Sequence, residues 1–239
     1  LGARDIAERL QLPQKLYGRQ EVVATLIGAF QLATQTRTSG FLLVSGEAGI
    51  GKSALIQELH RPIVERHGHF LAGKFEQFER DIPYGAIVQG MQSLVREVLA
   101  KPEPQVAAWR YRLGEALGIN GPLLVGIIPQ LALILGPQEP ATLQSPVEAH
   151  ARFKTAVRSF FWAFTDPEHP VVLFLDDLQW ADSDSLDLLT DLVGDPDIKG
   201  LLLVGATRSD EDEASRALSQ TLDRIRGTGA AVSTITVEP

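Results

Sequence analysis

Gly46-Glu47-Ala48-Gly49-Ile50-Gly51-Lys52-Ser53 is the stretch that decides the fold, and it matches the pattern G-x-x-x-x-G-K-[ST] at every position. Glycines in such a loop let successive backbone N–H groups surround an anion, and the following helix adds the positive end of its dipole. The ammonium group of Lys52 can reach the β and γ phosphates of a nucleotide, and the hydroxyl of Ser53 can bind Mg²⁺. We therefore predict a nucleoside triphosphate site on residues 46–54, with Ala54 as its last member.

The sequence on either side of this loop has the pattern that such a site requires. Residues 41–45 form a short, fully apolar run between Gly40 and Gly46, which indicates a buried strand. Residues 53–67 have helical periodicity, and Pro62 is expected to kink the helix or end it early. With a strand before it and a helix after it, the loop is not an ordinary glycine turn.

The rest of the chain alternates apolar strands with amphipathic helices. Further strands are expected at residues 69–75, 171–175, 201–205 and 232–237, and further helices at 84–100, 146–165, 183–193 and 214–226. Strands that are apolar throughout must be covered on both faces, which indicates a parallel sheet between helices. The predicted fold is α/β: a three-layer P-loop NTPase with a five-stranded parallel sheet in the order 5-1-4-3-2.

The distribution of proline suggests how the chain is organised. Residues 101–145 contain six prolines and short helical pieces around 106–117 and 123–135, and we interpret them as a helical insertion between core elements. Residues 1–15 are interpreted as a linker or N-terminal arm, and residues 16–239 as one P-loop ATPase domain. Because the first residue is Leu rather than Met, we expect the chain to be a piece of a longer protein.

Two adjacent acids at the end of a predicted strand form the second half of the expected site. The apolar run of residues 171–175 is followed directly by Asp176 and Asp177. In P-loop proteins an acid in this place holds Mg²⁺, and a neighbouring acid can polarise the attacking water. We assign Asp176 and Ser53 to Mg²⁺ and Asp177 to water activation, with Lys52 as the other catalytic group. The doublet favours hydrolysis over phosphate transfer to a small acceptor.

Arg208 is a further candidate because it follows the predicted strand at residues 201–205. The carboxyl ends of parallel strands meet at one edge of a sheet, and a guanidinium group matches phosphate oxygens in a fixed fork. The alternative is a surface arginine that pairs with Asp210 or Glu211. Lys74, Arg80 and Asp81 follow the second strand and could face either the nucleotide or a partner.

Composition and missing motifs exclude several classes of protein. Cysteine is absent, which excludes thiolate chemistry, and no apolar run approaches the length of a membrane span, so a cytoplasmic protein is expected. The formal charge is −8, and residues 176–213 hold twelve acids against two bases, which argues against a nucleic-acid surface and indicates a mostly solvated acidic face. The only asparagine, Asn120, is not in an Asn-Lys-x-Asp motif, so a common GTPase is excluded.

For several other conspicuous side chains the sequence favours a structural role. His67 and His69 lack a third ligand at suitable spacing and are interpreted as exposed loop histidines. Trp180 is expected to pack in the loop after its strand. Core positions on helices are expected for the aromatic residues Trp109, Tyr111, Phe160, Phe161 and Trp162.

Four motifs together resemble a known family, the AAA-type ATPase module of signal-transduction ATPases with numerous domains, which includes the maltose-regulator type of transcription activators. The resemblance spans about residues 16–237. The motifs are Leu16-Tyr17-Gly18-Arg19, the loop at 46–53, Leu173-Phe174-Leu175-Asp176-Asp177-Leu178-Gln179-Trp180-Ala181-Asp182 and Gly205-Ala206-Thr207-Arg208. The resemblance implies that Gly18 and Arg19 lie beside the base and ribose and that Arg208 occupies the first sensor position.

Residues 13–19 and 73–84 are also similar to the ATPase segment of very large bacterial proteins, in which a serine/threonine kinase domain precedes this segment and sensor histidine kinase domains follow it. Members of the wider family act as switches, off with ADP and on with ATP. The chain departs from the family pattern at Val22, where glutamate is usual, and it is expected to lack the helical lid and winged-helix domain.

The sequence thus predicts a regulatory ATPase domain that binds Mg·ATP or ADP, hydrolyses ATP slowly and switches a multidomain signal-transduction protein. Its expected partners are ATP and flanking domains of the same chain, and it could also form an oligomer that depends on nucleotide. Direct binding of nucleic acid or of a membrane is not expected. The alternative is a scaffold that holds nucleotide without appreciable turnover. A small-molecule kinase is a third reading, which the acidic doublet disfavours.

Overall fold

The computed structural model describes residues 19–36, 38–77, 83–143, 145–208 and 212–238. The five strands form one parallel sheet in the order β2-β3-β4-β1-β5, which confirms the predicted order. The strands are β1 (Gly40–Gly46), β2 (His69–Lys74), β3 (Val171–Asp176), β4 (Leu201–Thr207) and β5 (Ala231–Val237).

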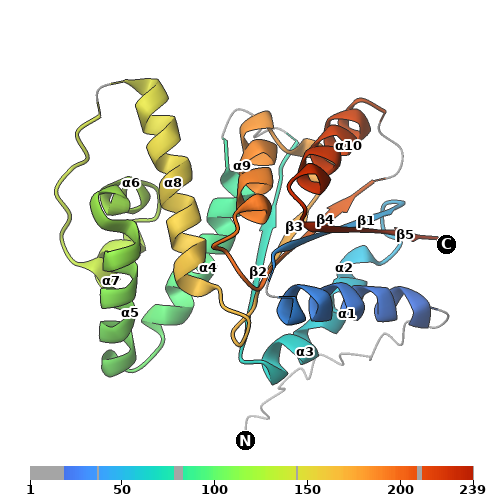
Figure 1. Cartoon of the computed structure of the whole chain (residues 1–239), viewed down its shortest axis with the longest axis horizontal. Coiled ribbons are helices and arrows are strands. Elements are labelled where there is room, and N and C mark those ends of the chain that lie inside the picture. The colour runs from blue at the N-terminus through green and yellow to red at the C-terminus, as the bar shows by residue number, and fades with distance from the viewer. Residues whose placement is uncertain (1–18, 37, 78–82, 144, 209–211, 239) are drawn as a thin grey trace, which may run out of the picture.

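Alternation of side chains along the strands divides the interior into two cores, one on each face of the sheet. One core contains Leu42 and Val44 of β1 and is covered by α1 (Gln20–Gln35), α2 (Lys52–Ile56) and α3 (His60–Glu65). The other contains Leu173 and Leu203 and is covered by α4 (Gly85–Leu99), α8 (Pro146–Phe164), α9 (Ser183–Gly194) and α10 (Asp212–Gly227). Helices therefore lie on both faces of the sheet, as the three-layer prediction requires (Figure 1).

One helix is interrupted, as the position of Pro62 led us to expect, and another helix was not predicted. The helix after the loop is interrupted by a 3-10 turn at Gln57–Leu59, one turn before Pro62. Proline lacks the N–H that would bond the carbonyl four residues earlier, so a regular helix cannot pass through this point. Helix α1 was not predicted from the sequence, although its buried residues Leu26, Phe30, Ala33 and Thr34 follow helical spacing.

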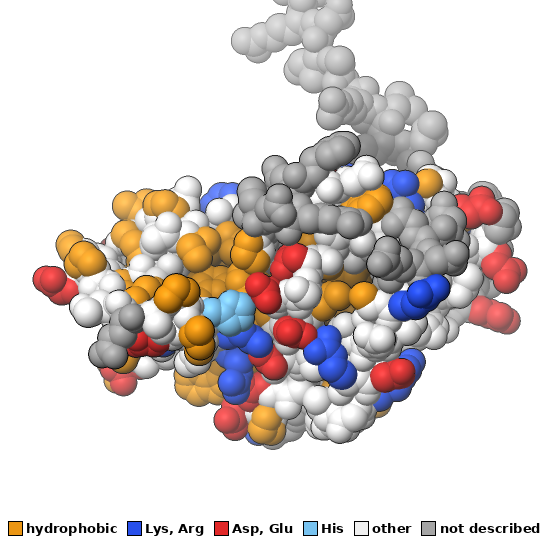
Figure 2. Space-filling view, turned by 90° about the horizontal axis from the view of Figure 1, so that it is seen from above, with side chains coloured by type: hydrophobic (Ala, Val, Ile, Leu, Met, Phe, Trp, Pro, Cys, Tyr) orange, Lys and Arg blue, Asp and Glu red, His pale blue; other side chains and the backbone are white. Residues whose placement is uncertain are grey.

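The predicted insertion is mostly helical between residues 103 and 135, and this part lies beside the sheet rather than on it. It contains α5 (Glu103–Leu117), α6 (Gly121–Ile127) and α7 (Ala132–Leu135), which pack on α8 and α4 at one end of the molecule (Figure 1). Figure 2 shows hydrophobic side chains gathered at this end. The core assignment was wrong for Tyr111 and Trp162, which are 72% and 50% exposed, and right for Phe160 and Phe161.

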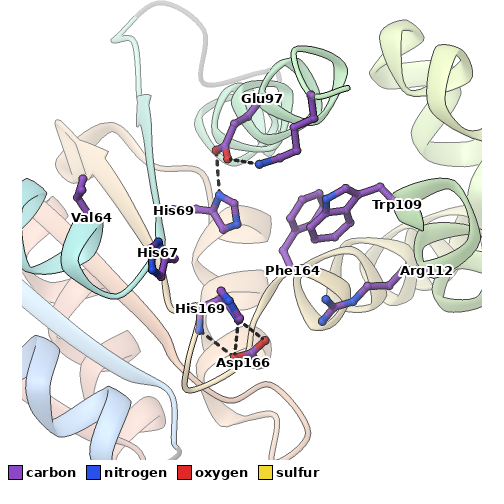
Figure 3. A pocket seen from close by; sticks show the side chains of 11 residues that line it. Val64, His67, His69, Glu97, Trp109, Arg112, Phe164, Asp166 and His169 are labelled. Carbon is purple, nitrogen blue, oxygen red and sulfur yellow. Dashed lines mark hydrogen bonds and ion pairs between the residues drawn. The ribbon is translucent and has the colours of Figure 1, made fainter. Parts of the chain in front are cut away.

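A cavity of about 480 Å³ opens at the amino-terminal edge of the sheet (Figure 3). His69 is only 9% exposed, so the expectation of an exposed loop histidine was wrong, and its Nδ1 lies 2.9 Å from Oε2 of Glu97. Lys101 also contacts Glu97, and the hydrogen bond from His69 is the main cause that holds the pKa of Glu97 below its ordinary value. Among the described residues no group of His, Asp and Glu has the arrangement of a metal site.

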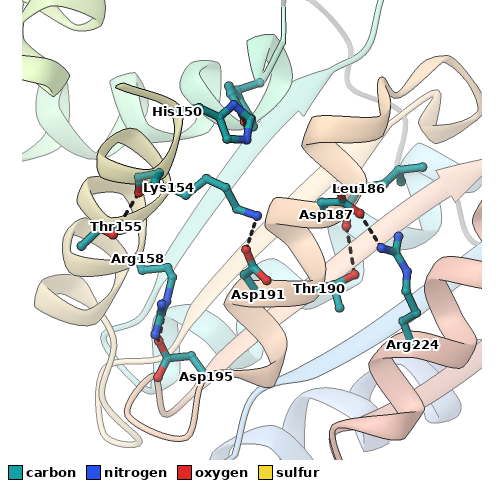
Figure 4. Close-up of polar contacts among 12 residues, drawn as sticks. His150, Lys154, Thr155, Arg158, Leu186, Asp187, Thr190, Asp191, Asp195 and Arg224 are labelled. Atoms are coloured by element: carbon teal, nitrogen blue, oxygen red, sulfur yellow. Dashed lines mark hydrogen bonds and ion pairs between the residues drawn. The ribbon is translucent and has the colours of Figure 1, made fainter. Parts of the chain in front are cut away.

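Helix α9 is held to its two neighbours by ion pairs (Figure 4). Asp191 pairs with Lys154 and Asp195 with Arg158, both on α8, while Asp187 pairs with Arg224 on α10. These three acids belong to the stretch that was predicted to be a solvated face. That prediction was wrong for Asp195, whose side chain is only 6% exposed, whereas the side chains of Asp187 and Asp191 stay 47% and 41% exposed. Across the described ranges no helix is both long and apolar enough to span a bilayer.

Gly73 should be irreplaceable, because β2 and α4 touch there through backbone atoms. A Cβ at this position would lie 1.9 Å from the carbonyl oxygen of Ala86. We expect Gly73→Ala to lower the free energy of unfolding by about 1–3 kcal/mol or more, measured by urea denaturation. The matched control is Gly114→Ala on the exposed side of α5, where a Cβ meets nothing within 4 Å. Gain of helix propensity should make that variant slightly more stable, by up to about 1 kcal/mol, and equal behaviour of the two variants would contradict the packing argument.

Glu97→Gln should change how stability depends on pH. Because the pKa of Glu97 is lowered in the folded chain, its contribution is present above the ordinary value of 4.5 and is lost as the pH falls below it. The carboxylate is nearly half exposed, so the loss at neutral pH should be no more than about 1 kcal/mol. Urea unfolding at about pH 7 and about pH 3 should show a difference from wild type only at the higher pH. Glu65→Gln, in an exposed pair with Arg61, is the control, and a loss that is equal at both pH values would refute the assignment.

Candidate functional site

The predicted phosphate loop lies between β1 and α2, at the carboxyl edge of the sheet. Gly49 and Gly51 have φ values of 76° and 96°, which side chains with a Cβ rarely adopt. These two positions need glycine for conformation, whereas Gly46 needs it for space. A Cβ on Gly46 would lie 2.8 Å from the carbonyl oxygen of Val237 at the end of β5.

Lys52 begins α2 and folds back over the loop. Its Nζ donates hydrogen bonds to the carbonyl oxygens of Gly46 at 2.8 Å and Glu47 at 2.9 Å. These contacts hold the ammonium group at the mouth of the loop, where the sequence pattern places it for phosphate binding. Ser53 is the next residue along the helix, and its side chain is exposed.

The two acids sit at the tip of β3, in register with the tips of its neighbours. Asp176 is the last residue of β3 and pairs across the sheet with Lys74 of β2. Asp177 has left-handed backbone geometry, with φ of 52°, and its N–H donates to Oδ1 of Asp176 at 2.9 Å. An L-residue rarely adopts this conformation, and such outliers are concentrated at functional sites.

A cleft of about 270 Å³ joins the loop to the acids and to Arg208, although these residues lie far apart in the sequence. Among the described residues, four that were predicted for the site do not line the cleft: Arg19, Gly46, Glu47 and Ile50. Glu47 is exposed, and Ile50 packs against the core beneath α1. The residues that line the cleft are Ala48, Gly49, Gly51, Lys52, Ser53, Ala54, Asp176, Asp177 and Arg208. Oxygen donors of the kind that Mg²⁺ prefers, Ser53 and Asp176, thus share one cleft with a lysine and an arginine.

Basic side chains from the strands on either side of β3 surround the carboxylate of Asp177. Lys74 Nζ lies 3.5 Å from Oδ2, and Arg208 Nε lies 3.7 Å from Oδ1. The sequence does not decide whether Lys74 faces the nucleotide or a partner, and the structure brings its side chain to the acidic doublet. Asp210 and Glu211, the alternative partners of Arg208, and also Arg80 and Asp81, lie outside the described residues.

Arg19 contacts the loop from the start of α1. Its Nη1 donates to the carbonyl oxygen of Ile50 at 2.7 Å, next to Gly51. The side chain therefore supports the backbone of the loop directly, which the sequence did not suggest. Gly18, predicted beside it, lies outside the described residues.

Two residues of the loop after β3 were not predicted to have a role at the site. The carboxylate of Asp182 caps α9 by accepting from the N–H of Ser185 at 2.7 Å. The side chain of Gln179 is buried and contacts both Asp177 and the backbone of Arg208. A polar residue between Leu178 and Trp180, both packed against the core, is the one signal that could have identified Gln179.

Two curated proteins have a segment that is similar in sequence to this chain. Hybrid signal transduction histidine kinase G of Dictyostelium discoideum is 31% identical over 189 residues, which cover 79% of this chain and 5% of the relative. Histidine protein kinase 1 of Candida albicans is 23% identical over 198 residues, which cover 77% of this chain and 8% of the relative. The chain thus spans less than a tenth of the length of these curated relatives.

Among solved structures, Cdc6p from Pyrobaculum aerophilum aligns with a TM-score of 0.48 and 16% identity, over 97% of this chain and 48% of that chain. The model of the family described as AAA ATPase domain matches residues 15–204, which include the phosphate loop and both acids. The chain therefore belongs to the AAA ATPase domain family.

Proposed function

We propose that this chain is a regulatory ATPase domain that binds Mg·ATP, hydrolyses it slowly and acts as a nucleotide-dependent switch in a multidomain signal-transduction protein. The observation that carries the proposal is the single cleft in which the loop, the acidic doublet and Arg208 meet. Supporting it, the relatives with matching segments are histidine kinases many times longer than this chain.

Each residue of the cleft has a proposed role in this reaction. The loop N–H groups and Lys52 hold the β and γ phosphates, and Ser53 and Asp176 hold Mg²⁺. Asp177 accepts a proton from the attacking water, and Arg208 senses the γ phosphate. Arg19 and Gly18 are proposed to contact the base and ribose of the nucleotide.

The domain organisation belongs to the same proposal. Residues 16–239 form one cytoplasmic ATPase unit with an insertion at 101–145, and residues 1–15 are a linker. Its partners are other domains of the same polypeptide, such as the serine/threonine kinase and sensor kinase domains of the large bacterial proteins that it resembles, with ATP as the ligand.

A second function, that of a scaffold which holds nucleotide without turnover, is favoured by one specific contact set. The carboxylate of Asp177 is engaged by Lys74, Gln179 and Arg208. A carboxylate that is held by three donors is less available to a water molecule than a free one would be.

Lys52→Ala should abolish ATP binding in a calorimetric titration with Mg²⁺. The substitution removes the charged donor from the mouth of the loop, and charge-assisted hydrogen bonds to phosphate are among the strongest in proteins. Lys199→Ala, an exposed position away from the cleft, should bind like wild type. Binding of equal strength by the Lys52 variant would end the proposal of a phosphate-loop site.

Asp177→Asn should separate hydrolysis from simple holding of the nucleotide. Asparagine keeps the shape of the side chain but cannot accept the proton, so phosphate release should fall by about 100-fold or more while ATP binding is kept. Asp197→Asn, on an exposed loop, is the control and should release phosphate at the wild-type rate. No detectable release from either wild type or the Asp177 variant would instead support the scaffold.

A further inference from the structure

Gln179 is a buried polar residue with both ends of its amide engaged. It lies in the 3-10 turn Leu178–Trp180 that follows Asp177, and it is 5% exposed. Its Nε2 donates to Oδ1 of Asp177 at 2.8 Å, and its Oε1 accepts from the backbone N–H of Arg208 at 3.3 Å. One side chain therefore joins the tip of β3 to the tip of β4.

The chemistry of its two partners fixes the orientation of this amide. An ionised carboxylate can only accept a hydrogen bond, and a backbone N–H can only donate one. The NH₂ group must therefore face Asp177 and the carbonyl oxygen must face Arg208. A group that offers a donor and an acceptor in the same places could substitute, whereas an apolar or anionic group could not.

Gln179 makes the shortest of the side-chain contacts to the Asp177 carboxylate. Lys74 and Arg208 approach it only to 3.5 Å and 3.7 Å. Asp177 has left-handed backbone geometry, which holds only where the surroundings enforce it. Gln179 is not among the residues that line the cleft, so it does not touch the space where nucleotide is proposed to bind.

We propose that Gln179 is a positioning residue of the ATPase, which aims the Asp177 carboxylate and ties it to the segment that carries Arg208. This inference rests on the proposed hydrolysis of ATP at the cleft. It assigns Gln179 an effect on the rate of turnover and none on the affinity for nucleotide, because its amide contacts the carboxylate of Asp177 and the backbone N–H of Arg208 but not the guanidinium group that is proposed to meet the γ phosphate.

Gln179→Glu tests the inference through its dependence on pH. A protonated carboxyl group has an O–H donor and a C=O acceptor, so at acidic pH it reproduces both contacts of the amide. When the new carboxyl group ionises, it offers no donor to Asp177 and repels the carboxylate of Asp177. The negative charge of Asp176 adds to this repulsion, while the positive charges of Lys74 and Arg208 reduce it. The kcat of Gln179→Glu relative to wild type should therefore fall by about tenfold or more between about pH 5.5 and about pH 8.5.

Two further variants separate positioning from a general loss of structure. Gln179→Met, similar in length but without hydrogen bonds, should have a low kcat at every pH, with the dissociation constant for ATP unchanged. Gln138→Glu, in the insertion, should follow wild type at every pH. Thermal unfolding of each variant verifies that it is folded. The change of kcat with pH is measured within a single variant, so it does not depend on a difference in stability between variants.

The outcomes distinguish this inference from the proposed function. If wild type releases no phosphate, the proposed hydrolysis fails and the inference fails with it. If wild type is active and Lys52→Ala is not, but the relative kcat of Gln179→Glu is constant with pH, the positioning role alone is refuted. Weaker ATP binding by Gln179→Met at unchanged kcat would also overturn it.

Discussion

The register of the parallel strands is the constraint on which the rest of this structure depends. Ser45 of β1 lies opposite Thr207 of β4, and Lys74 of β2 lies opposite Asp176 of β3. Because all strands run in one direction, the segments that follow them start at one edge of the sheet. The loop, the acids and Arg208 meet there without any direct contact between the strands that carry the loop and the acids, since β4 separates β1 from β3.

Much of the fold could be predicted because its signals are local. Apolar runs of about five residues between turn residues indicate strands that are buried on both faces, and the predicted order of these strands is the one that the structure has. The errors have physical reasons as well. Tyr111 on α5 and Trp162 on α8 are aromatic residues of the kind found in cores, but their side chains are exposed. Periodicity alone cannot tell which stripe of a helix meets its neighbours.

The sequence could predict which residues form the candidate site, but it could not predict how these residues contact one another. The residues of the loop and the acidic doublet are fixed by motif, and the cleft brings most of them together. Three contacts at the site could not be predicted, because they join elements that are far apart in the sequence or depend on the rotamer of one side chain. They are the hydrogen bond from Arg19 to Ile50, the ion pair of Lys74 with Asp177 and the hydrogen bonds of the Gln179 amide. No spacing rule in a single sequence encodes such contacts.

The position of β1 in the sheet determines when the site can be completed as the chain is made. β1 is near the start of the sequence, but its two neighbours are β4 and β5, and the Ser45 hydroxyl donates to the carbonyl oxygen of Ile235, 190 residues later. Contacts of such long range form slowly, because a large loop must close first. During synthesis, β1 cannot pair with β4 and β5 until almost all of the described chain has been made. Until then the unpaired edges of β1 are exposed and can associate with other chains.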